Sequence, residues 1–144
     1  MTKWGPLVYA KEGDAGFDLR AAIPEPIELR PGNPVSVPLG VHFAMPDPIP
    51  GFVMELQIRS RSGLVTKHGV AVLNSPGTVD SGYRGEIRCT LHTVAGPFAI
   101  EPGMRVAQGV FGIVPVMKFE DVPSLEMLGE TSRGAAGFGS TGLS

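Results

Sequence analysis

Glycine and proline interrupt this chain at short intervals over its whole length, and this feature limits the fold most. The 20 glycines and 14 prolines stand between short apolar runs and do not form one block. Both residues disfavour long helices and suit tight turns. Short apolar runs separated by turn residues are typical of an all-β chain, and 144 residues suffice for one domain. The sequence therefore predicts a single all-β domain.

Apolar and polar residues alternate in two of these runs with the two-residue period of a strand, in 52–60 and in 86–93. Such alternation places the apolar side chains on one face of a sheet. These side chains are Met54, Leu56 and Ile58 in the first run and Ile87, Cys89 and Leu91 in the second. Further strands are predicted near Ile27, from Val35 to Met45, near Val70, near Phe98 and, in a long run, from Arg105 to Phe119.

Only residues 62–69 can hold a turn or two of helix, with Ser62 as the candidate N-cap. The whole pattern predicts a single-domain β-barrel of jelly-roll character with closed or protected sheet edges.

Strand patterning stops after Phe119, which divides the chain into a β-barrel core, 1–120, and a C-terminal arm, 121–144. The arm is expected to cross an apolar surface of its own or a neighbouring subunit through Val122, Leu125 and Leu128.

Composition limits the classes of partner. Twelve Lys and Arg against 14 Asp and Glu give a net charge of −2, which predicts no broad face for a nucleic-acid polymer and no polybasic membrane surface. Neither a signal sequence nor a run of about eighteen apolar residues is apparent, so we expect no membrane span and no secretion. The single Cys89 cannot form an intrachain disulfide, and we expect it buried in a reducing compartment. These points predict a cytoplasmic protein.

Residues 59–64, RSRSGL, place two guanidinium groups and two hydroxyls where a strand ends and the predicted helix begins. Arginine binds phosphate oxygens through a forked pair of donors, and helix N–H groups add a positive end. The segment therefore suits a phosphate group. A solvated strand end with a helix cap accounts for the same residues.

Residues 74–87 read as two strands joined around turn residues at Pro76-Gly77 and Ser81-Gly82. In such a place Asp80 could act as a general base on a water molecule, and Tyr83 offers a flat face to a sugar or base. The alternative is a hairpin in which Asp80 only caps the turn.

Two further segments combine strand pattern with charge. Residues 12–22 carry three acids around a glycine, which suits Mg²⁺ or an N-terminal strand with acidic flanks. In residues 103–109, Arg105 and Gln108 lie in an apolar strand, where they need partners or an exposed sheet edge. The three histidines are scattered without metal-ligand spacing, so a zinc site is not expected.

The tail segment GFGSTG, 137–142, fits the G-x-G-x-x-G pattern of dinucleotide-binding loops. That loop needs a helix after it, and only Leu143 and Ser144 follow, so we do not expect a dinucleotide-binding domain. A Gly-rich terminal stretch is commonly disordered, which is the simpler interpretation.

The order of five segments along the chain is more specific than any segment alone, and it resembles the five motifs of the trimeric dUTPases (deoxyuridine 5′-triphosphate nucleotidohydrolases). The segments are DAGFDLRA from Asp14, RSGL from Arg61, NSPGTVDSGYRGE from Asn74, GMRVAQ from Gly103 and RGAAGFGSTG from Arg133. The resemblance implies a homotrimer of jelly-roll-like β-barrels of the dUTPase-like β-clip fold, with active sites shared between subunits. It also implies Mg²⁺-dependent hydrolysis of dUTP to dUMP and pyrophosphate, which keeps dUTP low and supplies dUMP for thymidylate synthesis.

The resemblance to the third motif implies that Asp80 is the general base that activates the attacking water. Tyr83 would pack under the deoxyribose and exclude a 2′-hydroxyl. The uracil would be bound by Asn74, Gly77, Thr78, Val79 and Arg88, largely through main-chain atoms.

The second and fourth motifs imply the phosphate side of the site. The groups assigned to the phosphates are Arg61, Ser62, Gly63 and Gln108, with Arg105 in support. Asp18 would stand behind the water shell of the metal, so Mg²⁺ would be held by substrate phosphates and waters and by no protein group directly. In the arm, Phe138 would stack on a neighbour's uracil while Arg133, Gly139 and Ser140 surround the γ-phosphate.

Three positions depart from the family pattern: Ser60 replaces a common proline, Gly109 a large aliphatic residue and Ala136 a glycine of the arm. The alternatives are a dCTP deaminase of related fold and a trimeric regulatory protein that uses a nucleotide as a switch. The segment with Asp80, Gly82 and Tyr83 favours hydrolysis over deamination. An intact Asp80 argues against a purely non-catalytic regulator and leaves a second role open.

Overall fold

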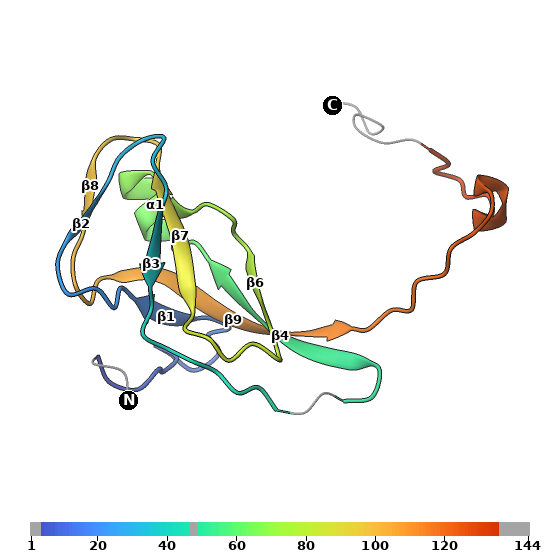
Figure 1. The fold of residues 1–144 in the computed structure, drawn as a ribbon, viewed down its shortest axis with the longest axis horizontal. Helices are drawn as coiled ribbons and strands as arrows, with labels where there is room; N and C mark the ends of the chain where they lie inside the picture. The colour runs from blue at the N-terminus through green and yellow to red at the C-terminus, as the bar shows by residue number, and fades with distance from the viewer. Residues whose placement is uncertain (1–3, 47–48, 136–144) are drawn as a thin grey trace.

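A computed structural model describes residues 4–46 and 49–135. Its strands are β1 (Phe17–Arg20), β2 (Ile27–Leu29), β3 (Val35–Pro38), β4 (Phe52–Arg59), β5 (Val70–Val72), β6 (Gly77–Asp80), β7 (Arg88–Thr93), β8 (Phe98–Ile100) and β9 (Arg105–Pro115). A helix, α1 (Ser62–His68), and a 3-10 turn, η1 (Leu125–Leu128), complete the regular structure of these residues (Figure 1). The prediction of an all-β fold is confirmed.

The strands form three antiparallel sheets. One sheet has the order β1-β9-β4-β6, a second the order β3-β7-β5, and β2 pairs with β8 in a third. In the described part of the chain these sheets are not hydrogen-bonded into one closed barrel, although the jelly-roll-like class was predicted correctly. The long β4 and β9 form the base of the molecule, and β3 and β7 lie above them (Figure 1), with β5 paired to β7.

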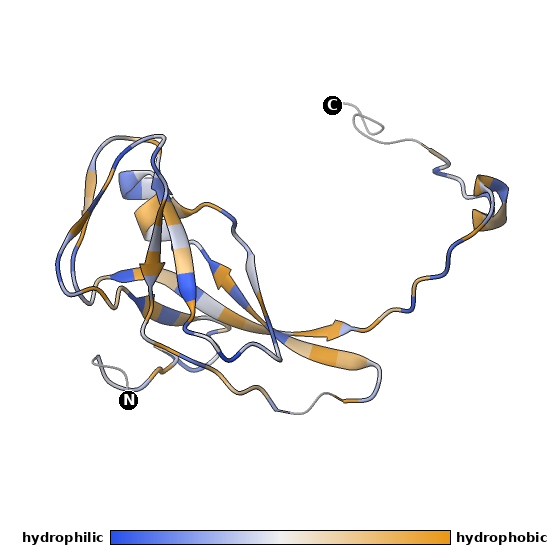
Figure 2. Cartoon of the chain, in the orientation of Figure 1, coloured by the Kyte–Doolittle hydropathy of each residue, from blue (hydrophilic) through white to orange (hydrophobic). Residues whose placement is uncertain are grey.

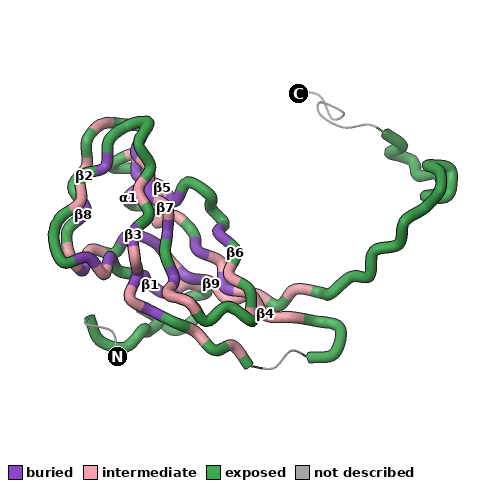
Figure 3. The backbone as a smooth tube through the Cα atoms, viewed as in Figure 1, coloured by how far each residue is buried: buried purple, intermediate pink, exposed green. Residues whose placement is uncertain are grey.

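One hydrophobic core joins the sheets. The alternating positions predicted from the sequence supply it, because Leu56 and Ile58 of β4 are buried, as are Cys89 and Leu91 of β7. The buried segments cluster where the sheets meet (Figure 3), and apolar residues lie along the same strands (Figure 2). The core therefore holds together the elements that carry the candidate site.

The apolar face of β4 continues beyond this core. Phe52 and Met54 alternate with Leu56 on one face of the strand, and Met54 pairs with Ile113 of β9. Phe52 is 43% exposed and Ile113 is 60% exposed, whereas Leu56 is fully buried. The outer end of the β4–β9 pair thus leaves apolar side chains uncovered by the rest of the described chain.

Gly109 is buried in β9, directly opposite Phe17 of β1. A Cβ atom at Gly109 would lie 2.5 Å from Cζ of Phe17, so the phenyl ring occupies the space that a side chain would need. Cross-strand aromatic cover of this kind compensates for a glycine inside a strand. The departure from a large aliphatic residue at position 109 is therefore matched by the ring of Phe17.

Three local predictions need correction. The N-cap of α1 is Arg61 and not Ser62, which is the first helical residue. The strand predicted from Val35 ends at Pro38, because Gly40 adopts φ +66 and turns the chain. The hairpin alternative for 74–87 is wrong, since β6 and β7 belong to different sheets.

Beyond β9 the chain leaves the sheets (Figure 1), and every residue of 115–135 is exposed. The strand run predicted to reach Phe119 ends earlier, at Pro115, and no strand follows within residues 116–135. No helix among the described residues is long and apolar enough to cross a membrane.

Candidate active site

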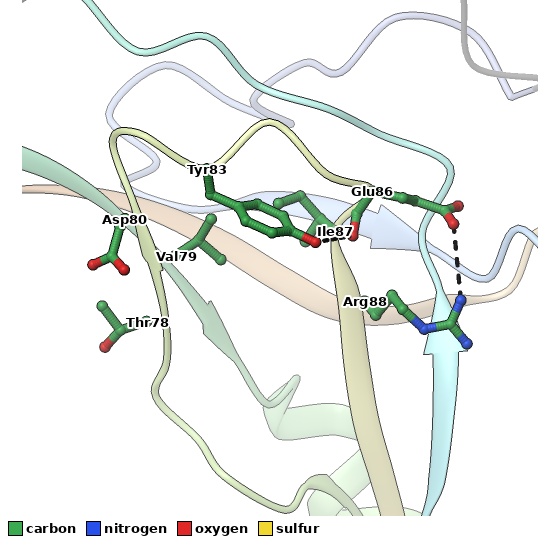
Figure 4. A pocket seen from close by; sticks show the side chains of 7 residues that line it. All are labelled: Thr78, Val79, Asp80, Tyr83, Glu86, Ile87 and Arg88. Atoms are coloured by element: carbon green, nitrogen blue, oxygen red, sulfur yellow. Dashed lines mark hydrogen bonds and ion pairs between the residues drawn. The ribbon is translucent and has the colours of Figure 1, made fainter.

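The first hollow of interest, called the Tyr83 hollow, opens between β6 and β7 and has a volume of about 230 Å³. It exists because the chain crosses from one sheet to the other between Asp80 and Arg88. Its lining residues, shown in Figure 4, are Thr78, Val79, Asp80, Tyr83, Glu86, Ile87 and Arg88.

The Tyr83 side chain is fixed although it is 47% exposed. Its hydroxyl donates a hydrogen bond to the Glu86 carbonyl oxygen at 3.1 Å, and its backbone N–H donates to the Asp80 carbonyl at 3.0 Å. Figure 4 shows the ring lying across the loop between Val79 and Ile87. The hollow therefore presents a flat aromatic face whose orientation is set by the loop itself.

Asp80 is the last residue of β6 and is exposed. Its carboxylate points to the same side of the strand as Thr78, whereas Val79 points towards Tyr83 (Figure 4). Within residues 4–46 and 49–135, the Asp80 carboxylate accepts no hydrogen bond and forms no ion pair. An unpaired carboxylate at the rim of a hollow can accept a proton from a water molecule.

Two charged residues that line the Tyr83 hollow, Arg88 and Glu86, form hydrogen bonds with neighbouring segments of the chain. Arg88 donates from Nε to the Ser36 hydroxyl at 2.9 Å and from Nη2 to the Ser36 carbonyl at 3.0 Å. Glu86 accepts from the Gly40 N–H at 3.1 Å and lies 3.8 Å from Nη1 of Arg88. The Arg88 side chain is thus engaged by Ser36 of β3.

A second hollow, called the Asp18 hollow, has a volume of about 510 Å³ and lies along β1, β9 and the end of β4. Its charged and polar lining contrasts with that of the first hollow. The lining residues are Ala10, Asp14, Ala15, Gly16, Asp18, Arg59, Arg61, Arg105, Gln108 and Val110.

Asp18 organises the cations of this hollow. Its Oδ1 accepts from Nε of Arg61 at 2.8 Å, and its Oδ2 accepts from Nη1 of Arg105 at 3.1 Å. Arg61 also donates from Nη1 to the Arg105 carbonyl at 3.2 Å. One carboxylate holding two guanidinium groups leaves a net positive site with further N–H donors, which suits a polyanion.

Ser60 and Gln108 tie this hollow to the rest of the chain. The Gln108 side-chain amide donates to the Ser60 carbonyl at 2.9 Å. The Ser60 hydroxyl accepts from the Val72 N–H at 2.9 Å, and the Ser60 N–H donates to the Ser75 hydroxyl at 3.3 Å. Proline has neither this hydroxyl nor this N–H, so Ser60 replaces it with two hydrogen bonds of its own.

The two hollows share no lining residue. Asp80 pairs with Glu55 of β4, whereas Gln108 pairs with Arg59, so the stretch of β4 from Glu55 to Arg59 separates them. At about 3.3 Å per residue this separation is roughly 13 Å along the strand, with a strand spacing added across the sheet. The predicted site residues of one chain are therefore assembled into two separate halves.

A row of hydrogen-bonded side chains spans the distance between the halves on the face of β4 opposite to Leu56. Gln57 donates from its amide to Oε1 of Glu55, and Arg59 donates from Nε to Oε1 of Gln57 at 2.9 Å. Gly112 of β9 lies opposite Glu55 and leaves room for its carboxylate. This polar face carries Asp80 at one end and the Asp18 hollow at the other.

Several predicted residues lie outside both hollows. Asn74 and Gly77 stand together where β6 begins, and a Cβ at Gly77 would lie 3.1 Å from Nδ2 of Asn74. Ser62 and Gly63 are exposed in the first turn of α1, directly after Arg61. Arg133 is in the exposed arm, while Ala136, Phe138, Gly139 and Ser140 lie outside the described residues.

Sequence reasoning did not select Glu86 or Arg59 as site residues. Glu86 had no chemical signal beyond its place in the third segment. Arg59 had one, because it is the first guanidinium of RSRSGL and follows Gln57 in the strand alternation.

Titration and metal-binding groups add two observations. Burial raises the pKa of the Cys89 thiol to about 12, with the positive charge of Arg88 opposing this effect more weakly. The thiol therefore stays neutral and unreactive at physiological pH. Among the described residues no cluster of three or more His, Cys, Asp or Glu could hold a metal ion.

Comparison with known proteins relates this arrangement to a family. The family model for dUTPase matches residues 2–142. The chain belongs to the dUTPase family. It is therefore an enzyme of the dUTP diphosphatase class, as the resemblance of the five segments predicted.

Curated relatives carry the corresponding name. The deoxyuridine 5′-triphosphate nucleotidohydrolase of Chlamydia pneumoniae is 51% identical over 137 residues, which cover 94% of this chain and 90% of that protein. The protein of the same name from Rhizobium leguminosarum bv. trifolii is 48% identical over 138 residues, covering 94% of this chain and 83% of that protein.

Solved structures share the fold at lower identity. A Staphylococcus bacteriophage 80alpha dUTPase with dUPNHPP has a TM-score of 0.77 and 24% identity, covering 96% of this chain and 92% of that chain. A mutant dUTPase of phage phi11 of S. aureus, described with a structural Mg(II) ion, has a TM-score of 0.68 and 21% identity. Its alignment covers 85% of this chain and 92% of that chain, so the jelly-roll-like fold is common to all three.

Proposed function

We propose that this enzyme hydrolyses dUTP to dUMP and pyrophosphate, with Asp80 as the general base for water attack on the α-phosphorus. The observation that carries the proposal is the unpaired Asp80 carboxylate at the rim of the Tyr83 hollow. A base in that position removes a proton from water as the water attacks phosphorus. The Asp18 hollow supplies the guanidinium donors that stabilise negative charge moving towards the pyrophosphate leaving group.

We propose further that the active unit is a homotrimer in which the Tyr83 hollow of one chain meets the Asp18 hollow of another. The separation of the two hollows within one chain supports this arrangement, as do the uncovered apolar side chains of Phe52 and Ile113. The arm, 121–144, would close a neighbour's site through Arg133, Phe138, Gly139 and Ser140. The exposure of its described residues, 121–135, supports this role.

The donor set of the Asp18 hollow fits Mg²⁺ that arrives on the triphosphate. Asp18 is committed to Arg61 and Arg105, and the hollow contains only one other carboxylate, Asp14, among several cations. Mg²⁺ prefers water and phosphate oxygens to a protein cage, so Asp18 would accept hydrogen bonds from its water shell. The metal would neutralise phosphate charge and orient the α-phosphorus.

Substrate selection in this proposal depends on the walls of the Tyr83 hollow. Main-chain groups of Thr78, Val79 and Arg88 would pair with the uracil edge, together with Asn74 and Gly77 where β6 begins. A base with a different edge would leave these groups unpaired, which costs binding energy. Tyr83 would pack against the deoxyribose and exclude a 2′-hydroxyl.

The proposed role in the cell is to keep dUTP low and to supply dUMP for thymidylate synthesis. We keep the expected cytoplasmic location as part of the proposal. The buried free thiol of Cys89 supports it, because a lone thiol needs no oxidising compartment.

The proposal is tested with Asp80→Asn, which keeps the shape of the side chain and removes the base. We expect turnover of dUTP to fall by about 10²- to 10⁴-fold while dUTP binding is retained. Glu55→Gln is the matched control, since Glu55 is the carboxylate paired with Asp80 across the sheet and lies outside the proposed chemistry. Near-normal turnover of Asp80→Asn would refute the base assignment.

Incubation of the purified enzyme with dUTP, dCTP, dTTP or UTP and Mg²⁺ tests the substrate. Product analysis by chromatography should give dUMP and pyrophosphate from dUTP, with little product from the other three. Release of ammonia from dCTP would instead support the deaminase alternative.

A further inference from the structure

We infer that Gly85 sets the position of the Tyr83 ring and, through it, the preference of the enzyme for deoxyribose over ribose. The inference rests on the proposed function and adds to it a residue that would touch neither substrate nor reacting atoms. Gly85 is thus a positioning residue of the Tyr83 hollow.

The Tyr83 ring lies over Gly85 at a distance that leaves no room for a side chain. A Cβ atom at Gly85 would lie 2.5 Å from Cζ of Tyr83 and 3.0 Å from Cε2, and it would also overlap the hydroxyl oxygen. Real Cβ atoms do not approach ring carbons so closely, because dispersion attraction becomes steep repulsion well before that distance. The ring can occupy its place only because residue 85 is glycine.

Backbone conformation does not explain this glycine. Gly85 is absent from the glycines with positive φ in the described chain, so alanine meets no backbone strain there. Gly82, three residues earlier in the same loop, also lacks a positive φ, and a Cβ there would meet nothing within 4 Å. Alanine variants at the two positions therefore distinguish an effect on loop flexibility from an effect on the space that the Tyr83 ring occupies.

The atoms that obstruct a Cβ at position 85 belong to the end of a half-exposed side chain and not to backbone. An alanine can be accommodated if the Tyr83 ring swings outwards, because the ring is 47% exposed and borders the hollow. That movement breaks the hydrogen bond from the hydroxyl to the Glu86 carbonyl, which fixes the ring now. The fold should survive while the flat wall of the hollow moves.

A displaced ring changes sugar selection more than it changes chemistry. Asp80 lies on β6, whose pairing with β4 does not involve Gly85, so the base keeps its place. The wall that would contact C2′ of the sugar, however, no longer has a fixed position. A 2′-hydroxyl is then excluded less strictly, because steric discrimination depends on a wall that cannot yield.

The test compares kcat/KM for dUTP and for UTP in the wild-type enzyme, Gly85→Ala and the control Gly82→Ala. For Gly85→Ala we expect the ratio of dUTP to UTP to fall by about tenfold or more. The ratio should stay within about twofold of wild type in Gly82→Ala. An unchanged ratio in Gly85→Ala, or an equal fall in both variants, overturns the inference.

A double-mutant cycle with Tyr83→Ala distinguishes positioning from general damage. Once the ring is removed, Gly85→Ala should cause no further change in the dUTP to UTP ratio. A further fall of the same size in the Tyr83→Ala background would show that Gly85 acts independently of the ring and would refute the inference.

Tyr83→Phe provides a second test that does not depend on the folding of Gly85→Ala. It keeps the ring and removes only the hydrogen bond to Glu86, so we expect a smaller fall of the ratio in the same direction. An unchanged ratio would contradict the premise that the hydrogen bond to Glu86 fixes the ring where selection needs it. A wild-type enzyme that hydrolyses no dUTP would refute the proposed function itself, which is a separate outcome.

Discussion

In the proposed function, the Tyr83 hollow and the Asp18 hollow would recognise different chemistry by different means. The Tyr83 hollow is bordered by the β6–β7 segment and by one ring fixed over a glycine, so its selectivity would depend on the shape of the space between them. The Asp18 hollow is made of side-chain ion pairs around one carboxylate, so its affinity depends on charge. The comparison indicates that nucleoside and phosphate recognition can be changed separately in this enzyme.

Among the changes that test this comparison, the largest effect is expected from Arg61→Ala, which removes the shorter of the two Asp18 ion pairs. We expect kcat/KM for dUTP to fall by about 10²- to 10³-fold, because a preorganised donor for the phosphates is lost. Binding of deoxyuridine, which has no phosphate, should stay unchanged in titration calorimetry. Arg30→Ala is the control, since Arg30 is an exposed arginine paired only with Glu28 of β2. Equal losses for dUTP and deoxyuridine would contradict the separation of the hollows.

A chain ending at Arg133 tests whether the arm serves either hollow. We expect turnover to fall by about 10²-fold, because the positioning of the phosphates is lost. Thermal unfolding and oligomeric state should not change, since the strands that form the core end at Pro115, before the truncation point. A chain lacking only Leu143 and Ser144 is the matched control. Turnover at the full rate in the chain ending at Arg133 would exclude a catalytic part for the arm.

The smallest effect is expected behind the Tyr83 hollow, at Cys89. Its folded pKa of about 12 lies above the ordinary thiol value of 9.0, so between these values the thiol ionises in the unfolded chain only. Stability contributed by the neutral thiol is therefore complete below pH 9 and is lost as pH rises towards 12, by about 1 kcal/mol per pH unit.

Denaturant unfolding at pH 8 to 10.5 and fixed protein concentration measures this effect. Cys89→Ala should lose less stability than wild type over this range, with dUTP turnover at neutral pH within about twofold of wild type. Parallel stability curves for the two proteins would show that the thiol does not titrate on unfolding.

The sequence predicted the positions of the strands better than it predicted which strands pair with each other. Period-two alternation identifies Leu56 and Ile58 as buried because it is a property of one strand and its own environment. It contains no information on which sheet a strand joins, and so the chain between β6 and β7 could be taken for a hairpin. The opening of the Tyr83 hollow depends on that crossing, and only the structure reveals it.

The residues of the candidate site were predicted from the order of five segments and not from local chemistry. Asp18 illustrates the limit, because its contacts with Arg61 and Arg105 join residues far apart in the chain. Gly85 illustrates another, because the need for glycine arises from a ring two residues away and not from its own backbone. Constraints of this kind arise from contacts in space, and neither the periodicity nor the composition of the sequence indicates them.

In the proposed trimer, the uncovered apolar end of β4 and β9 makes the amount of active enzyme depend on the concentration of its chains. In the proposed trimer, Phe52 and Ile113 are sheltered only after three chains have met, so assembly follows mass action. When most chains are apart, halving their concentration lowers the number of trimers by about eightfold. A cell that halves synthesis of this protein while most of its chains are apart would therefore lose most of its proposed dUTP-clearing capacity.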